Sequence, residues 1–143
     1  MSAQNKAIID RLNKELWTEG NLAVVDELFT TNFVNHDPGA PEVRTIEEFK
    51  QWANTTFTAF PDFQATTEDL VAEGDKVAER WTVRGTHKEA LGDIAATGKQ
   101  MTLPGMCHYR IAGGKIAECW WCYDNLSLLQ QLGVIPPPEQ GES

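Results

Sequence analysis

The stretch that most constrains the fold runs from residue 115 to residue 133, KIAECWWCYDNLSLLQQLG. Its first part, which ends at Asp124, carries two tryptophans, two cysteines and a tyrosine, and it predicts a β-strand. The segment LSLLQQLG then predicts about two turns of helix, ended by Gly133 and the Ile-Pro-Pro-Pro that follows. A strand of such bulky residues, joined directly to a helix, needs a concave and mostly apolar place for one of its faces.

Upstream of this stretch, apolar residues follow first helical and then strand spacing. Residues 3–17 predict a one-faced helix, and Asn21 is a suitable N-cap for a second one. Thr45 and Glu48 have the capping-box spacing of a third helix, which ends at Pro61. Residues 33–39 predict a short extended piece that ends in a turn. Four strands are predicted at residues 63–71, 76–87, 99–111 and 115–124. This order predicts an α+β fold whose curved sheet encloses a pocket.

Length and charge limit the classes of partner. The 143 residues predict one domain over residues 1–135, followed by a flexible, proline-rich tail at residues 136–143. Twenty-one acidic residues against twelve Lys and Arg give a net charge of -9, which repels nucleic acids and anionic membrane surfaces. No signal peptide and no apolar run of about 18 residues is evident, so we expect a cytoplasmic protein.

The three cysteines are Cys107, Cys119 and Cys122. Their odd number favours free thiols over a disulfide framework. Cys119 and Cys122 have the C-x-x-C spacing of redox and zinc sites, but residues three apart in a strand point to opposite faces. We therefore interpret all three as small buried hydrophobic residues, and bound zinc or a Cys119–Cys122 disulfide would contradict this.

Several segments together resemble the SnoaL-like polyketide cyclase family, within the nuclear transport factor 2-like fold. They are DELFTTNFVNHDP after Asn21, RGTH at residues 84–87, the TGK turn at 97–99, YRIAGGKI, and WWCYDNLSLLQQLG. The resemblance implies a cone-shaped α+β barrel in which three N-terminal helices pack on a strongly curved, mostly antiparallel sheet. It also implies an apolar pocket, no metal or organic cofactor, and homodimers or higher homo-oligomers formed through the sheet.

The best-known members of this family close a polyketide ester by an intramolecular aldol reaction, using acid-base chemistry. In the resemblance, the catalytic aspartate of these cyclases falls on Trp121 and their pocket histidine falls on Cys107. The positions that match are Asn35, His87 and Asp124. The implied function is cofactor-free acid-base chemistry on a hydrophobic, oxygenated small molecule, such as aldol-type cyclisation, isomerisation or hydration and hydrolysis, with a rearranged set of residues. The alternative is a ligand-binding or assembly domain without chemistry.

Asp124 and His36 are the predicted catalytic residues. Asp124 lies where a strand meets a helix, so it is either the N-cap of that helix or a base at the rim of an apolar pocket. His36 is either a polar loop residue or an acid at the pocket mouth, since the ordinary histidine pKa of about 6.5 suits proton transfer. The residues predicted to bind the substrate are Asn35, Trp52, His87, Cys107, Trp121 and Tyr123.

The loop of the last hairpin decides which residues face this pocket. A three-residue loop ending at Gly114 predicts pairs whose numbers sum to 226, such as Cys107 with Cys119 and Gly105 with Trp121 on the pocket face. His108 would then pair with Glu118 on the outer face. A two-residue loop would instead turn His108 toward the pocket.

Overall fold

A mixed five-stranded sheet organises the fold in the computed structural model, which describes residues 2–136. The strand order is β1-β5-β4-β3-β2. The strands are β1 (Phe29–His36), β2 (Gln64–Glu73), β3 (Lys76–Thr86), β4 (Gln100–Ala112) and β5 (Lys115–Tyr123). Only the β1–β5 pair is parallel, so the sheet is mostly antiparallel, as predicted. The predicted extended piece at residues 33–39 is the end of β1, a fifth strand beyond the four predicted ones, followed from residue 37 by the predicted turn.

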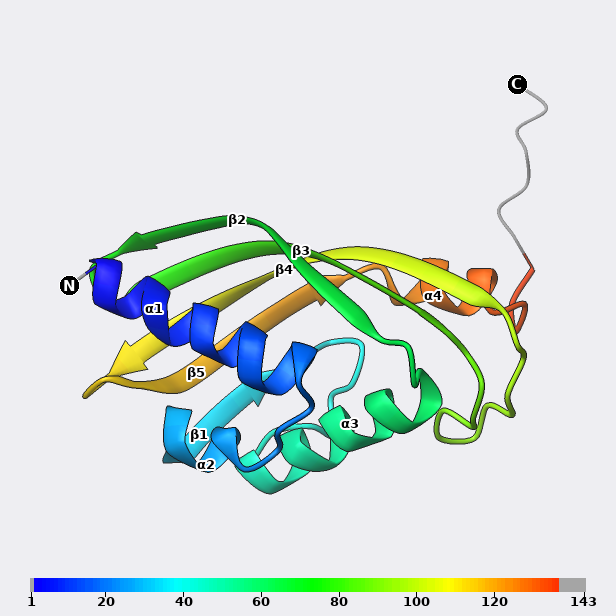
Figure 1. Cartoon of the computed structure of the whole chain (residues 1–143), viewed down its shortest axis with the longest axis horizontal. Helices are drawn as coiled ribbons and strands as arrows, with labels where there is room; N and C mark the ends of the chain where they lie inside the picture. Colours follow the sequence, from blue (N-terminus) through cyan, green and yellow to red (C-terminus); the bar gives the residue numbers. More distant parts are fainter. Residues whose placement is uncertain (1, 137–143) are drawn as a thin grey trace.

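The helices pack on the sheet, which arches over those from the N-terminal half of the chain (Figure 1). Helix α1 (Ser2–Leu12) continues directly into a π-helical segment, η1 (Asn13–Thr18), and both contact β2. Helices α2 (Val24–Leu28) and α3 (Ile46–Ala59) contact β1, and the last helix, α4 (Asn125–Gln131), contacts β4 at the other end of the sheet. The α+β class and the helix-covered, curved sheet are therefore confirmed. The predicted flexible tail lies, except for Pro136, outside the described residues.

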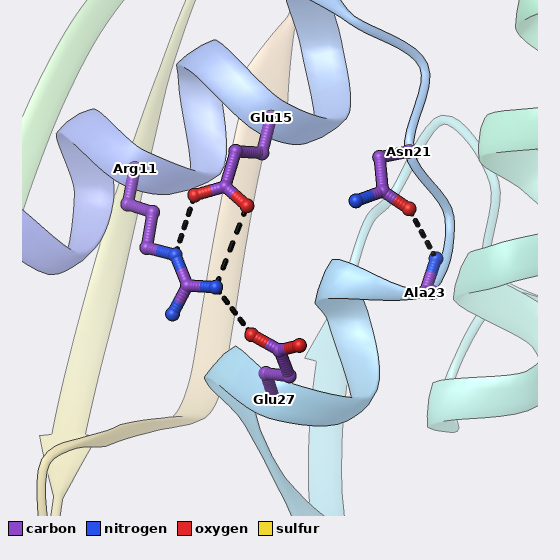
Figure 2. A network of polar contacts seen from close by, with 5 residues as sticks. All are labelled: Arg11, Glu15, Asn21, Ala23 and Glu27. Atoms are coloured by element: carbon purple, nitrogen blue, oxygen red, sulfur yellow. Dashed lines mark hydrogen bonds and ion pairs between the residues drawn. The ribbon is translucent and has the colours of Figure 1, made fainter.

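An ion-pair network joins α1 and η1 to α2 (Figure 2). Arg11 donates to Glu15 one turn later and also to Glu27 of α2. Asn21 is not the N-cap of α2 as predicted, because the helix begins later, after Ala23. The Asn21 side chain instead accepts from the Ala23 N–H (3.2 Å) and shapes the turn before the helix.

Helix α3 begins at the capping box that the sequence predicts. The Thr45 hydroxyl accepts from the Glu48 N–H (3.4 Å), and the Glu48 carboxylate accepts from the Thr45 N–H (3.2 Å). These bonds satisfy backbone donors that a helix start otherwise leaves free. The buried face of the helix carries Phe49 and Ala53, which pack into the main core.

The β4–β5 hairpin has a two-residue loop, so the predicted three-residue loop is wrong. Gly113 and Gly114 both adopt positive φ (+58° and +77°), and Ala112 pairs with Lys115. Glycine tolerates such angles at both central positions, which is what a tight hairpin turn of this type requires. The pairs predicted further along the strands are consequently displaced as well.

A β-bulge follows the loop and restores the predicted faces. The register shifts at Ala117, so Cys107 lies opposite Trp121 rather than Cys119. His108 likewise lies opposite Trp120 rather than Glu118. The loop and the bulge together shift the pairing by two residues, and a shift of two keeps every side chain on its predicted face. His108 is accordingly exposed on the outer face of the sheet.

The three cysteines carry free thiols. Cys107 and Cys119 are buried, but Cys122 is exposed, so the prediction that all three are buried is wrong for Cys122. It lies on the opposite face of β5 from Cys119, as the strand period requires. Within the described part of the chain, no helix is long and apolar enough to cross a membrane.

Candidate functional site

A cavity of about 230 Å³ lies between the inner face of the sheet and the helices. Its wall is largely aromatic. Four tryptophans line it, namely Trp17, Trp52, Trp81 and Trp121. Two tyrosines and two phenylalanines complete the aromatic lining, namely Tyr109, Tyr123, Phe60 and Phe63. Such a wall binds flat or branched apolar groups and leaves orientation to the few polar atoms in the cavity.

Specific contacts fix the positions of these rings. The Trp121 indole N–H donates to Asn35 Oδ1 (2.6 Å), and this bond links β5 to its parallel neighbour β1. The Trp81 ring lies against Gly105, where a β-carbon would be only 2.3 Å from the ring. Gly105 is therefore needed for close packing of the ring on β4. Trp17 meets Trp52 edge to face, with ring centroids 5.7 Å apart.

One end of the cavity holds a buried carboxylate, Glu79, whose residue is 4% exposed. Its Oε1 accepts from the Tyr109 hydroxyl (3.0 Å) and from the Cys107 thiol (3.6 Å). Its Oε2 accepts from the Thr67 hydroxyl (2.7 Å) and from the Asn13 side-chain amide (2.6 Å). Four neutral donors thus converge on one carboxylate, which is how a buried acid is satisfied in the absence of a basic partner.

Glu79 was not among the site residues predicted from the sequence, although the sequence carries a signal for it. Val77, Glu79 and Trp81 alternate along β3, so they share one face of the strand. Val77 is fully buried and Trp81 lines the cavity, which places the acid between two inward-facing residues. An acid at such a position is unusual and marks a candidate for function.

Burial raises the pKa of the Tyr109 hydroxyl well above its ordinary value, and the neighbouring Cys107 and Glu79 add to the effect. Tyr109 therefore stays protonated near neutral pH, and its hydroxyl donates a hydrogen bond to the Glu79 carboxylate. Burial also raises the pKa of the Cys119 thiol. Both groups stay uncharged near neutral pH. Glu79 is the one Asp or Glu among the described residues that line the cavity.

A second buried carboxylate, Asp37, lies just behind the wall. Its Oδ2 accepts from the hydroxyl of Tyr123 (3.0 Å), and its Oδ1 accepts from the Gly39 N–H (2.9 Å). Burial raises the pKa of Asp37, and the hydrogen bond from Tyr123 partly opposes this rise. Burial, followed by the nearby Asp37, raises the pKa of Tyr123 as well. Gly39 leaves room for the tyrosine, because a β-carbon there would lie 2.7 Å from the Tyr123 oxygen.

His36 lies outside the cavity. The alternation of β1 turns Asn35 inward and His36 outward. The side chain of His36 is 44% exposed, stacks on Trp120 (centroids 5.3 Å apart) and contacts Glu118 (Nε2 to Oε2, 2.6 Å). This hydrogen bond lowers the pKa of Glu118. The geometry therefore does not bring His36 together with the cavity, and its catalytic role stays a prediction.

Asp124 caps helix α4. Its Oδ1 accepts from the Ser127 N–H (2.9 Å), which is the geometry of an N-cap, one of its two predicted roles. The side chain is exposed and does not line the cavity, whereas the following Asn125 and Leu128 do. A catalytic role for Asp124 also stays a prediction.

Among the predicted substrate-binding residues, Trp52, Trp121 and Tyr123 line the cavity. Asn35, His87 and Cys107 are buried behind the wall. His87 is fully buried, accepts from the Thr97 N–H at Nδ1 (3.3 Å) and packs on Phe60. Its Nε2 has no hydrogen-bond partner among the described residues.

Comparisons with known proteins agree with this architecture. The family model described as SnoaL-like polyketide cyclase matches residues 7–132. A protein from Acidithiobacillus ferrooxidans, provisionally named a polyketide cyclase, shares 31% identity with a TM-score of 0.81, covering 94% of this chain and 97% of its own. IdmH from Streptomyces antibioticus, which also has the provisional name polyketide cyclase, shares 32% identity with a TM-score of 0.78, covering 91% and 99%.

A third protein, from Jannaschia sp. CCS1 and provisionally named a SnoaL-like polyketide cyclase, has a TM-score of 0.85. It shares 23% identity and covers 94% of this chain and 95% of its own, so it shows likeness of fold. No curated protein sequence gives a significant match. The family model spans most of the chain, and the chain therefore belongs to the SnoaL-like polyketide cyclase family.

Proposed function

We propose that this protein binds a hydrophobic, oxygenated small molecule in the aromatic cavity and transfers protons on it without a cofactor. Aldol-type cyclisation, isomerisation and hydration or hydrolysis all belong to this chemistry. The observation that carries the proposal is the pair formed by Glu79 and Tyr109, whose oxygens lie 3.0 Å apart at one end of the cavity. General acid-base catalysis needs such a titratable group within hydrogen-bond reach of the bound molecule.

In this proposal Glu79 is the base. It takes a proton from an acidic C–H or O–H of the ligand and returns it to another atom of the same molecule, so cyclisation and isomerisation consume no further reactant. In hydration or hydrolysis, Glu79 takes the proton from a water molecule that adds to the ligand, and returns it to the ligand or the leaving group. The Tyr109 hydroxyl donates to the carboxylate and keeps its orientation fixed. Preorganised contacts of this kind reduce the rearrangement that the reaction itself requires.

The proposed base differs in position from the acid-base pair implied by the resemblance. In the resemblance, Trp121 falls on the position of the catalytic aspartate of the cyclases, and its indole forms part of the wall. Cys107 falls in the resemblance on the position of their pocket histidine, and its thiol donates to Glu79 (3.6 Å). The place of Trp121 in the wall and the contact of Cys107 with Glu79 support a rearranged set of residues, in which β3 supplies the acid in place of β5.

One observation favours a second candidate function, ligand binding without chemistry. The oxygens of Glu79 already accept from four donors, so a ligand must displace one of them before it can pass a proton to the carboxylate. A carboxylate held in this way can also serve only to fix a ligand in place.

Proton exchange separates the two functions without knowledge of the natural substrate. Aryl ketones and diketo esters would first be screened for binding by the shift in melting temperature. Each bound compound would then be incubated with the protein in D₂O, and loss of its C–H signals would be followed by NMR. We expect the wild-type protein to accelerate this exchange and Glu79→Gln to slow it by at least about a hundredfold.

Glu73→Gln provides the matched control, because Glu73 is an exposed acid at the end of β2. This control should exchange at the wild-type rate. Bound ligands that exchange no faster than in buffer would contradict the proposed chemistry and leave the binding function. Accelerated exchange that is undiminished in Glu79→Gln would contradict the assignment of Glu79 as the base.

We also propose that two copies associate through the outer face of the sheet, as the resemblance implies. The supporting observation is a strip of exposed apolar side chains on that face. It comprises Met106 (57% exposed), Val71 (56%) and Trp120 (36%). The strip borders a shallow groove between β2 and β5. Exposed apolar residues grouped in this way are typical of interaction surfaces.

A further inference from the structure

The carboxylate of Glu79 has no basic partner within the described residues. Glu79 is 4% exposed, and none of the ion pairs in residues 2–136 includes it. Its four hydrogen-bond partners are an amide, two hydroxyls and a thiol, and all four are neutral. Buried charges in proteins are normally paired with a charge of the opposite sign, because their removal from water is costly. The environment of Glu79 therefore favours a cation that the protein itself does not supply.

The polar atoms around Glu79 offer acceptors to a ligand. Asn13 uses both amide hydrogens, one toward Thr67 Oγ1 (2.9 Å) and one toward Glu79 (2.6 Å). The hydroxyls of Thr67 and Tyr109 each direct their hydrogen to Glu79 as well. What they leave toward the cavity are oxygen lone pairs. A group that brings its own hydrogens, or a positive charge, fits this end of the cavity better than a group that needs a donor.

The aromatic wall favours the same kind of group. The faces of tryptophan rings carry a partial negative charge and attract cations, tryptophan most strongly among the aromatic side chains. The four tryptophans form a continuous set, with centroids of Trp17 and Trp52 at 5.7 Å, Trp52 and Trp121 at 6.0 Å, and Trp81 and Trp121 at 6.2 Å. Cages of aromatic rings are a recurring way of binding ammonium ligands.

Charge outside the site acts in the same direction. No Lys, Arg or His is among the described residues that line the cavity. The chain as a whole carries a net charge of -9, which attracts cations toward it and repels anions. Local and long-range electrostatics therefore agree.

We infer that the natural ligand carries a positively charged nitrogen, a protonated amine or a related organic cation, bound between Glu79 and the tryptophans. This inference rests on the proposed function, because it names the class of molecule that the same cavity takes. A cavity of about 230 Å³ is larger than the roughly 150 Å³ that holds benzene in a dry protein interior. An amine attached to one or two small rings therefore fits its size. The positive nitrogen would also withdraw electrons from adjacent C–H bonds and so help Glu79 to remove a proton.

Three probes of similar shape test this inference: 2-phenylethylamine, 2-phenylethanol and phenylacetate. They present a cation, a neutral hydroxyl and an anion on the same ring. Binding would be measured at pH 7 by calorimetry and by fluorescence of the cavity tryptophans. We expect the amine to bind at least about tenfold more tightly than the alcohol, and phenylacetate to bind most weakly. Equal binding of amine and alcohol, or tighter binding of phenylacetate, would overturn the inference with the wild-type protein alone.

Glu79→Gln adds a second test. It keeps the size of the side chain and removes the charge, so the preference for the amine should fall to within about twofold of the alcohol. Glu73→Gln should keep the wild-type preference, because Glu73 is exposed and does not line the cavity. A full amine preference in folded Glu79→Gln would overturn the role of the carboxylate.

The outcomes for binding and for chemistry are separable. If the amine preference is found but no bound compound exchanges its protons, the ligand class stands and the proposed chemistry fails. If neutral ketones exchange rapidly and the amine has no advantage, the chemistry stands and the ligand class fails.

Discussion

Replacing Tyr123 by Phe isolates the hydrogen bond that holds the cavity wall to Asp37. The Tyr123 hydroxyl donates to Asp37 Oδ2 at 3.0 Å, and Asp37 is only 5% exposed. A hydrogen bond to a buried, charged acceptor contributes about 1.5–3 kcal/mol, against about 1 kcal/mol for a neutral pair. At pH 7 we therefore expect Tyr123→Phe to lower the free energy of unfolding by about 2 kcal/mol, measured by urea unfolding.

The effect depends on pH in a defined direction. Burial raises the pKa of Asp37 above its ordinary value, so the folded state binds this proton more tightly than the unfolded state. Stability therefore decreases as the pH rises from the ordinary pKa of the aspartate through its raised value. The hydrogen bond from Tyr123 lowers the pKa of Asp37 and so reduces this loss. Without it, the pKa of Asp37 rises further and the loss on raising the pH becomes larger.

The difference in free energy of unfolding between wild type and Tyr123→Phe should consequently decrease from about 2 kcal/mol at pH 7 to about 1 kcal/mol at a pH where Asp37 is protonated. Asp37→Asn provides the control, since an amide oxygen at this position does not titrate. In that background, Tyr123→Phe should cost about the same at every pH. A cost that does not change with pH in the wild-type background would refute the assigned pairing of Asp37 and Tyr123.

Two further predictions concern the last helix and the outer face. Asp124→Ala should lower the free energy of unfolding by about 1 kcal/mol, while Asp124→Asn should have little effect, because asparagine is nearly as good an N-cap. A proton-exchange rate that falls about a hundredfold in Asp124→Asn would instead identify Asp124 as the base. Met106→Glu should be a monomer where the wild-type protein is a dimer, as measured by light scattering. The fold of each protomer should keep its stability, because Met106 is 57% exposed and its replacement disturbs no core packing. A wild-type protein that is monomeric at high concentration would rule out the proposed association.

Local patterns in the sequence predicted the elements whose causes are local. The capping box of Thr45 and Glu48 is confirmed because both hydrogen bonds lie within one turn of helix. The pocket face of β4 and β5 is confirmed because side chains alternate along any strand, whatever its partner. The same alternation in β1 turns Asn35 inward and His36 outward, but the predicted extended piece was too short to show this alternation.

Other features depend on contacts between distant parts of the chain. The bulge at Ala117 and the two-residue glycine loop set the register of the hairpin, and no local pattern specifies where an extra residue is accommodated. The parallel pairing of β1 with β5 brings Asn35 to Trp121, 86 positions away. Antiparallel neighbours are often joined by a short turn that can be recognised in the sequence, whereas parallel strands need a long connection. The pairing of β1 with β5 therefore has no local sequence signal.

The candidate site shows the same division. Sequence alone determined the family, the aromatic lining at Trp52, Trp121 and Tyr123, and the excess of negative charge. Only the tertiary structure decided that Glu79, rather than Asp124 or His36, faces the cavity. The physical reason is that a buried acid is stable only where hydrogen-bond donors surround it. The donors to Glu79 come from η1, β2 and β4, between 12 and 66 residues away in the sequence.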